Sequence, residues 1–368
     1  MAWLSLLLLL TACGPSNVDE RNGLTVAAAL GGDEVSGYSR AIEARDFVFP
    51  HDHGPHPDFR NEWWYVTGNL QADDGRRFGF QATFFRVAIA PGMPASTSRW
   101  ATNQVWMAHF ALTDVAAGRH HAFERFARGA AGLAGAGASP FAVWLEDWRM
   151  ASIDGDGFPW RLRLAEQGIA LDLTLDPRKP IALQGDRGLS QKSAEPGNAS
   201  YYYSATRLAA EGSVTSNGAT ARVDGLAWLD REWSTSALGP DQTGWDWFAL
   251  QLDDGTDLMY YRMRRHDGSA DPHSKGLWVA PDGGSRRLSA DDVELEVLDR
   301  WRSPHTGKTY PSRWRLKLLP SGREFVVTPL VEEQEMRLTV HYWEGAVEVT
   351  ERPRGRSVGR GYVELAGY

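Results

Sequence analysis

The strongest constraint on the fold is an internal repeat. Residues 70–75 (LQADDG) return as 250–255 (LQLDDG), each after a Trp/Tyr cluster and before an alternating apolar run. Asp-Asp-Gly is a common hairpin turn, so this match is weak by itself. Three more pairs keep the same order: 160–164 (WRLRL) with 314–318 (WRLKL), Tyr203 and Glu211-Gly212 with Tyr342 and Glu344-Gly345, and 225–229 with 361–365. Four ordered pairs predict an ancient duplication of one β-unit.

Strand patterns bounded by turn residues dominate the rest of the chain, and amphipathic helices are scarce. Short strands without helical segments between them favour antiparallel barrels or sandwiches over a parallel α/β sheet. We therefore predict an all-β chain of two tandem antiparallel β-barrels, each long enough to enclose a small apolar ligand; a sandwich is the alternative. The glycine-rich stretch 129–139 is expected to leave the first barrel as an excursion, in which a helical turn can form.

Composition narrows the range of partners. The 368 residues are enough for two domains that each bury a core. A formal charge of −8 without any run of Lys or Arg offers no surface for a phosphate backbone, so we expect no nucleic-acid partner. Sixteen Trp side chains suit barrel interiors and binding pockets, and most of them are expected in the cores.

The N-terminal residues form an export-signal pattern. The apolar run 4–10 is far too short to span a bilayer, and it ends in Leu10-Thr-Ala-Cys13-Gly14. This ending resembles the lipobox of bacterial lipoproteins, in which the cysteine becomes the lipidated first residue. We predict a signal peptide at 1–13, a flexible tether at 14–45, and a lipid anchor that holds the protein in the bacterial cell envelope, facing the periplasm. Cys13 is the only cysteine, which excludes an internal disulfide and a thiol nucleophile.

Residues 51–62 contain the ligand types of a metal site, namely three histidines, Asp52 and Glu62. Their spacing matches no closed zinc pattern, and the Gly-Pro pair at 54–55 would break a strand that placed two imidazoles on one face. We therefore expect a turn with hydrogen-bonded histidines and no metal.

A second cluster joins the two copies, at 228–233 (WLDREW) and 244–247 (GWDW). Acids flanked by indoles are poorly solvated, which can raise the pKa of Asp230 and Glu232 toward neutrality and let them act as general acids. The positive charge of Arg231 acts in the opposite direction and lowers the pKa of an acid with which it pairs. If it pairs with Asp230 or Glu232, both acids stay ionised and structural, which is the interpretation that the sequence favours.

The chain lacks the common hydrolase and nucleotide-binding motifs: it has no Gly-x-Ser-x-Gly elbow, no His-Glu-x-x-His helix and no phosphate-cradling Gly-rich loop. Its many indole and phenol rings and few enclosed carboxylates suit a long apolar or polyunsaturated ligand. Such a site fits storage, or an alkene hydration in which an acid protonates the double bond and aromatic faces shelter the cation. His109 lies in an apolar strand and is expected to be a satisfied core residue.

Several motifs together resemble a known family. They are 49–56 (FPHDHGPH), 62–65 (EWWY), 108–110 (AHF), 184–186 (QGD), 202–204 (YYS), 228–233 (WLDREW), 244–247 (GWDW), 342–345 (YWEG) and 359–368. Over residues 46–368 the chain resembles the AttH-like branch of the carotenoid 1,2-hydratase (CrtC-like) family. The resemblance implies two lipocalin-like β-barrels, in agreement with the duplication, with domains at 46–235 and 236–368.

The resemblance implies divergent functions. Hydratases of the family add water to the terminal double bond of acyclic carotenoids, fungal relatives catalyse cycloadditions, and lipoprotein members are commonly linked with ABC transporter subunits. The hydratase branch has a functional histidine where Arg231 stands in this chain, whereas Trp233 is retained. Because arginine cannot shuttle protons near neutral pH, this departure argues against carotenoid hydration.

We therefore expect a membrane-anchored carrier of an apolar lipid or isoprenoid, without cofactor or metal. The alternative is a hydro-lyase or cyclase that acts on a polyene, with Asp230 or Glu232 as the acid. The second copy is expected to act mainly as support. The expected ligand contacts are His53, His56, Glu62, Trp63, Trp64, Tyr65, His109, Trp228, Trp233, Trp245 and Trp247.

Overall fold

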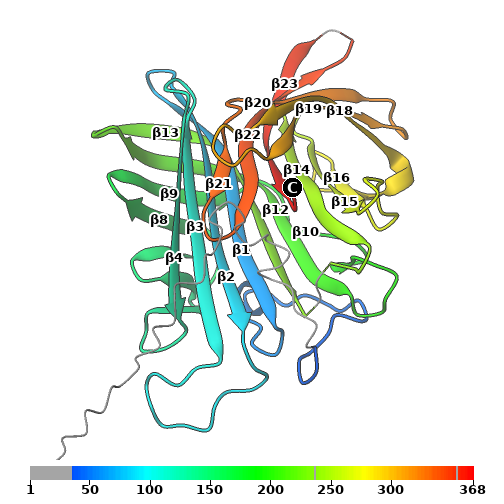
Figure 1. Cartoon of the computed structure of the whole chain (residues 1–368). Helices are drawn as coiled ribbons and strands as arrows, with labels where there is room; N and C mark the ends of the chain where they lie inside the picture. Colours follow the sequence, from blue (N-terminus) through cyan, green and yellow to red (C-terminus); the bar gives the residue numbers. More distant parts are fainter. Residues whose placement is uncertain (1–34, 236–237, 354) are drawn as a thin grey trace, which may run out of the picture.

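The computed structural model describes residues 35–235, 238–353 and 355–368. The predicted signal peptide, the lipobox at Cys13 and the tether as far as residue 34 lie outside the described residues. The described chain is built almost entirely from antiparallel strands (Figure 1). Its helices are two short 3-10 turns, η1 (His51–His53) and η2 (Ala290–Asp292), and none in the described ranges could cross a bilayer.

The first sheet has thirteen strands within the described residues, in the order β4-β3-β2-β1-β13-β12-β9-β8-β7-β6-β5, and β10 and β11 pair with β12. Its strands are β1 (Asn61–Ala72), β2 (Arg77–Ala88), β3 (Gln104–Asp114), β4 (Arg119–Arg128), β5 (Ala134–Ala138), β6 (Phe141–Leu145), β7 (Trp148–Ser152), β8 (Trp160–Glu166), β9 (Ile169–Pro177), β10 (Ala182–Leu183), β11 (Leu189–Gln191), β12 (Ala199–Ser216) and β13 (Ala219–Ser234).

The second sheet has ten strands in the same part of the chain, in the order β17-β16-β15-β14-β23-β22-β20-β19-β18, and β21 pairs with β22. Its strands are β14 (Gln242–Leu252), β15 (Asp257–Arg265), β16 (Lys275–Val279), β17 (Ser285–Ser289), β18 (Val293–Arg302), β19 (Thr309–Leu318), β20 (Glu324–Pro329), β21 (Glu335–Arg337), β22 (His341–Glu351) and β23 (Arg356–Ala366). Both sheets curve into barrel or half-barrel shapes, so the predicted all-β, two-barrel fold is confirmed.

The strand register confirms the duplication. In each sheet the first strand lies between its hairpin partner and the last strand, as β2-β1-β13 and as β15-β14-β23. Leu70 faces Gly225 in the first sheet, and Leu250 faces Gly361 in the second. Two independent sequence matches therefore lie opposite each other in both copies, as one repeated β-unit requires.

Two details differ from the sequence-based expectations. The glycine-rich excursion forms the strand β5 in a hairpin with β6, not a helical turn, and no equivalent hairpin extends the described second sheet.

The match of Tyr203 and Glu211-Gly212 to Tyr342 and Glu344-Gly345 was wrong, by one residue for the tyrosines and by four for the Glu-Gly pair. Tyr203 lies in the first core, whereas Tyr342 faces the region between the sheets and its neighbour Trp343 enters the second core.

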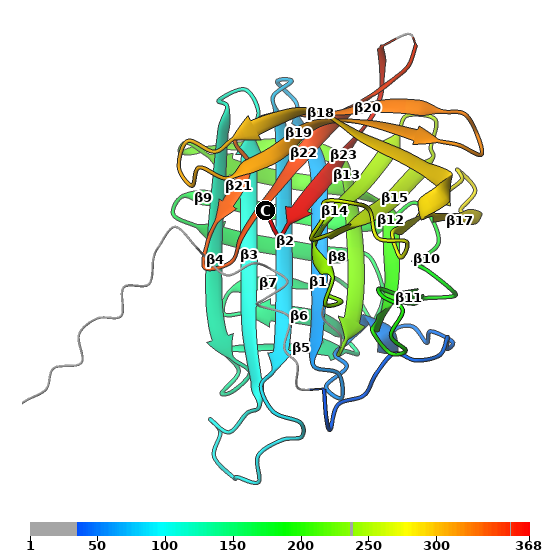
Figure 2. The same ribbon diagram turned by 45° about the vertical axis from the view of Figure 1, so that its right-hand side comes forward.

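The sheets pack against each other through a third buried layer. Strands β22 and β23 contact β2 and β1, and the second sheet lies across one end of the first (Figure 2). Strand β1 is therefore buried on both faces: Trp64 points into the first core, and its neighbour Tyr65 points into the inter-sheet layer. Strand β8, by contrast, alternates buried and exposed residues because its outer face meets solvent.

The repeated Asp-Asp-Gly turn provides a test of the backbone geometry. Gly75 has a φ of 87°, and a Cβ added there would meet nothing within 4 Å, so strain would come from the backbone alone. We expect Gly75→Ala to lower the free energy of unfolding by about 1–2 kcal/mol in urea denaturation. Gly157→Ala, which also adds a Cβ into open space but lacks a positive φ, should be nearly neutral. Equal effects of the two changes would contradict this explanation.

Candidate functional site

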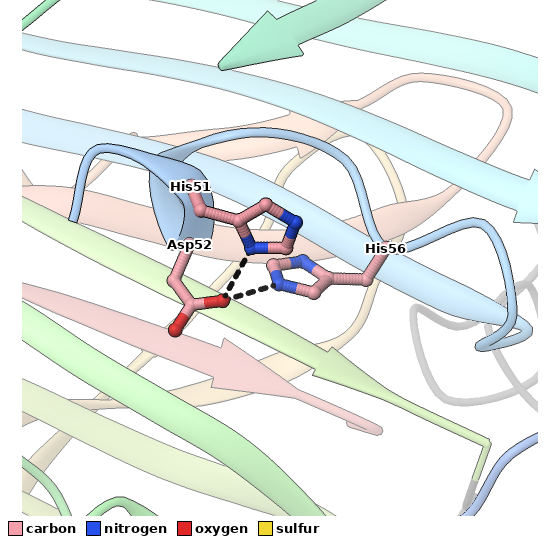
Figure 3. A group of neighbouring side chains, drawn as sticks. All are labelled: His51, Asp52 and His56. Carbon is pink, nitrogen blue, oxygen red and sulfur yellow. Dashed lines mark hydrogen bonds and ion pairs between the residues drawn. The ribbon is translucent and has the colours of Figure 1, made fainter. Parts of the chain in front are cut away.

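The turn η1 directs Asp52 into a buried hydrogen-bond network (Figure 3). Its Oδ1 atom lies 3.1 Å from His56 Nε2 and 3.2 Å from His51 Nδ1, and accepts a hydrogen bond of 2.8 Å from Arg45. Its Oδ2 atom accepts the backbone N–H of Val48 at 2.8 Å. Burial by itself would raise the pKa of Asp52, but these donors hold it well below its usual range. Asp52 is therefore an ionised anchor for the turn.

The ligating atoms of His51, Asp52 and His56 lie within 4.8 Å of one another, as a metal site requires. The surroundings oppose a cation, because Arg45 already binds Asp52 and Arg231 lies 3.2 Å from His56 Nδ1. Since arginine only donates, His56 Nδ1 must accept and Nε2 must carry the proton that it donates to Asp52. That proton occupies the lone pair that a metal would need, so this group favours a hydrogen-bonded turn over a metal site.

A second buried network, the arginine–carboxylate cluster, consists of Glu62, Arg86 and Arg231. Both guanidinium groups donate to the Glu62 carboxylate, and all three side chains are fully buried. Burial would raise the pKa of Glu62, but the charges of Arg231 and Arg86 hold it well below its usual range. Arg231 also lies 3.8 Å from the ring centroid of Trp64, a cation–π contact. The cluster locks β1, β2 and β13 together.

The expected pairing of Arg231 with Asp230 or Glu232 was wrong. Successive side chains of β13 point to opposite faces, so Arg231 enters the first barrel while both acids face the inter-sheet layer. Arg231 therefore pairs with Glu62, and among the described residues no salt bridge joins a cation to Asp230. For the same reason, the arginine that replaces the expected histidine does not lie among the inter-sheet acids.

Five of the expected ligand contacts belong to the packed interior of the first barrel. His53 Nδ1 lies 2.6 Å from the Tyr203 hydroxyl, and Trp64 donates its indole N–H to the His53 carbonyl at 2.8 Å. The ring of His56 stacks on Trp233 with centroids 3.7 Å apart. Burial lowers the pKa of His53 to about 4, so it is neutral. We therefore assign His53, His56, Glu62, Trp64 and Trp233 a structural role.

The inter-sheet acid cluster, defined as Asp230, Glu232, Glu344 and Glu364, is the stronger candidate site. Asp230 accepts hydrogen bonds from Ser204 at 2.5 Å, from the Trp228 indole at 2.7 Å and from the Tyr202 hydroxyl. Burial raises the pKa of Asp230 to about 7 although these donors favour its ionised form. This is the direction that the flanking indoles predict.

Glu364 supplies a second carboxyl group from the last strand of the second sheet. The Trp245 indole donates to its Oε1 atom at 2.7 Å, and the side chain keeps part of its surface accessible. Burial raises the pKa of Glu364 to about 7, and the hydrogen bond from Trp245 opposes this rise while the charges of Asp230 and Glu232 add to it. Glu364 can therefore exchange a proton near neutral pH.

Glu344, on β22, lies opposite Glu364 in the strand ladder. The Tyr65 hydroxyl donates to its Oε1 atom, whereas its buried Oε2 atom has no hydrogen-bond partner among the described residues. Burial raises the pKa of Glu344 well above its usual range, and the charge of Glu364 raises it further. Burial therefore favours the protonated form of Glu344.

Lysine and tyrosine side chains complete the polar part of the layer. Lys192 forms an ion pair of 2.9 Å with Glu232 and lies 4.5 Å from the ring centroid of Tyr261. His109 Nδ1 lies 2.8 Å from the Tyr342 hydroxyl, and burial lowers the pKa of His109 to about 3, so it is neutral. His109 Nε2 and the Tyr362 hydroxyl are buried without a partner in the described chain. Several polar atoms in this layer therefore lack a hydrogen-bond partner within the described chain.

The structure brings together eight of the predicted site residues and adds others. The eight are Trp63, Tyr65, His109, Trp228, Asp230, Glu232, Trp245 and Trp247. Sequence reasoning missed Lys192, Tyr202, Glu344, Tyr362 and Glu364. Two of them could have been found, because Glu344 on β22 and Glu364 on β23 are acids in otherwise apolar parts of their strands. The second copy supplies two acids and two indoles to this layer, whereas the sequence led us to expect it to act mainly as support.

The fold defines a class of protein with two tandem lipocalin-like barrels that share a buried, acid-containing layer. The model of the AttH-like family matches residues 40–368. The chain therefore belongs to the AttH-like family, as the sequence resemblance predicted. Among curated proteins, none matches this chain significantly.

Solved structures share the whole double-barrel arrangement. A Nitrosomonas europaea protein described as AttH has 36% sequence identity and a TM-score of 0.79, covering 90% of this chain and 99% of its own. Kievitone hydratase from Nectria haematococca has 15% identity and a TM-score of 0.66, covering 90% and 98%. The protein CghA with Sch210972 has 13% identity and a TM-score of 0.51, covering 94% and 97%. The last two similarities establish a common fold.

The raised pKa of Glu364 predicts a pH-dependent stability. An unfolded glutamate releases its proton near pH 4.5, whereas folded Glu364 holds it up to about 7, so the folded state binds more protons between these values. The free energy of unfolding should therefore fall as the pH rises through this window. Glu364→Gln should remove part of that fall, by about 3 kcal/mol at most, in urea titrations at about pH 5 and about pH 8.

The surface residue Glu348, on the neighbouring strand β22, provides the matched control, and Glu348→Gln should keep the wild-type pH dependence. If wild type and Glu364→Gln lose equal stability over the window, Glu364 does not hold its proton to neutral pH.

Proposed function

We propose that the protein binds an apolar, unsaturated small molecule in the inter-sheet layer and transfers a proton to it, as a hydro-lyase or cyclase. The observation that carries this proposal is the pair Asp230 and Glu364, whose pKa values are both raised to about 7 among indole and phenol rings. An acid with a pKa near the working pH is best suited to donate and then recover a proton.

Glu364 is the better proton donor of the two. Asp230 is held by three hydrogen-bond donors, whereas one indole holds Glu364 and part of its side chain stays accessible. Ionised Asp230 raises the pKa of Glu364 by charge repulsion, as does Glu232, although burial is the larger cause. Asp230 therefore acts as a positioning residue that tunes Glu364.

The reaction that follows is an addition of water. The Glu364 carboxyl gives its proton to one alkene carbon, and the electron pair of the double bond forms the new C–H bond. The faces of Trp245 and Trp247 stabilise the resulting carbocation. Water attacks the cation and returns a proton to the Glu364 carboxylate, which regenerates the acid. If a second double bond of the substrate attacks the cation instead, a ring and a new carbocation form, and loss of a proton from that cation to the Glu364 carboxylate completes a cyclisation and regenerates the acid.

The comparison with kievitone hydratase supports a shared fold and suggests hydration as the first reaction class to test. Incubation with an acyclic carotenoid should give a product heavier by one water, detected by mass spectrometry. Glu364→Gln should lower its rate by about 100-fold or more, since general acid catalysis commonly contributes that much. Glu348→Gln, outside the layer, should leave the rate unchanged. Wild-type rates from Glu364→Gln and from the double variant Asp230→Asn, Glu232→Gln would contradict these acid roles.

A lipid-anchored carrier is the second candidate. Four methionines, whose flexible side chains adapt to varied apolar ligands, lie in the inter-sheet layer. They are Met107, Met259, Met263 and Met336. In this proposal Cys13 carries the lipid, the protein faces the periplasm, and an apolar lipid or isoprenoid passes to or from an ABC transporter. The lipobox pattern supports this arrangement.

Binding of apolar probes tests whether the inter-sheet layer accepts a ligand or is completely filled by side chains. An apolar fluorescent probe should quench the tryptophan emission on binding, and Trp247→Leu should weaken its affinity by about 10-fold, because an aromatic contact of this kind contributes about 1 kcal/mol or more. Trp144→Leu, on the solvent side of β6, should bind as wild type does. Absence of binding by every apolar probe would contradict both candidate functions. Binding without turnover would favour the carrier.

A further inference from the structure

We propose that the β2–β3 loop, residues 89–103, docks on the surface of the bilayer in which the lipid anchor is held. Three large apolar side chains of this loop face solvent: Ile89 is 66% exposed, Met93 63% and Trp100 56%. Exposed apolar groups gathered on one loop mark an interaction surface. This inference rests on the proposed anchor at Cys13 and concerns the orientation of the protein on the membrane.

The composition of the loop fits a lipid surface. Residues 89–103 contain no acid and one basic side chain, Arg99, although the whole chain carries a formal charge of −8. Anionic headgroups therefore meet no opposing charge from the loop itself. Trp100 adds an indole, the side chain that is enriched at membrane–water interfaces because one edge is polar and the rest apolar.

A neighbouring turn extends the apolar surface, and the position of the loop on the barrel determines which end of the protein would face the bilayer. The backbone N–H of Ala131 donates to the Arg99 carbonyl at 3.0 Å, which places the turn containing the exposed Leu133 beside the loop. The loop, coloured cyan, projects from the end of the first barrel that lies away from the second sheet (Figure 2). Docking through it would leave the second sheet free of the bilayer.

The start of the described chain lies at the base of this loop. The Tyr38 hydroxyl donates to the Ala88 carbonyl at 3.0 Å, and Gly37 packs against Pro91. The same segment lines a shallow pocket together with Met93 and Asn103. The 21 residues from Gly14 to Glu34, which can span about 70 Å when extended, therefore join the barrel at the end where the exposed loop lies.

The lipid anchor and the loop make different contributions to membrane binding. The lipid chains supply most of the membrane affinity, and the three side chains contribute a weaker contact that selects one orientation of an already anchored molecule. An apolar loop could also bind another protein. In that case the loop would stay exposed to water on vesicles that contain no other protein. This difference provides the test.

The experiment uses the single cysteine. In the lipidated full chain the Cys13 sulfur is consumed by its thioether bond, so Met93→Cys introduces one reactive thiol for a polarity-sensitive fluorophore. On vesicles of phosphatidylethanolamine and phosphatidylglycerol, we expect a blue-shifted emission that nitroxide-labelled lipids quench at least two-fold. Leu298→Cys, on β18 in the second sheet, is the matched control and should report water on the same vesicles.

Equal, water-like emission from the two labelled positions would overturn the docking surface. Mass spectrometry of the unlabelled chain tests the anchor separately. If Cys13 carries no lipid, the anchor fails, and the loop is then judged on the Cys13→Ser, Met93→Cys chain mixed with excess vesicles. A label that stays in water there overturns the docking surface, and a quenched label supports it without the anchor.

Discussion

Burial of the strand pair β1 and β13 on both faces is the constraint on which the rest of the structure depends. One face closes the first core, where the Glu62 carboxylate receives two guanidinium groups. The other face forms the inter-sheet layer, where the Asp230 carboxylate receives hydroxyl and indole donors from the described residues. A one-residue slip in the register would exchange these two environments, so the buried charges also specify the pairing.

The two faces give carboxyl groups opposite properties. Desolvation acts on both, but two cations outweigh it at Glu62 and hold the pKa of that group low. In the part of the chain that the structure describes, no cation forms a salt bridge with Asp230 or Glu364, and their pKa values rise to about 7. The ion network and the Asp230 carboxyl group thus lie on opposite faces of β13.

Much of the fold could be predicted from the sequence, because strand alternation and turn chemistry are local. The Asp-Asp-Gly turns, the ordered matches and the paucity of helices were sufficient for two related barrels. The site was predicted only in part. Asp230 and its flanking indoles stood out as a cluster, but Glu364 and Glu344 stood alone in apolar strands, and only the packing of the second sheet on the first brings them to Asp230.

The sequence by itself determined the repeated β-unit, its turns and the residues that alternate along each strand, since these depend on a period of two and on neighbours in the chain. The tertiary structure alone decided which face of β13 meets cations and which meets carboxyl groups. Arg231 shows why: its partner Glu62 is 169 residues away in the chain, whereas the acids beside it in sequence point to the opposite side. Pairing across a sheet is a long-range property, and local patterns do not encode it.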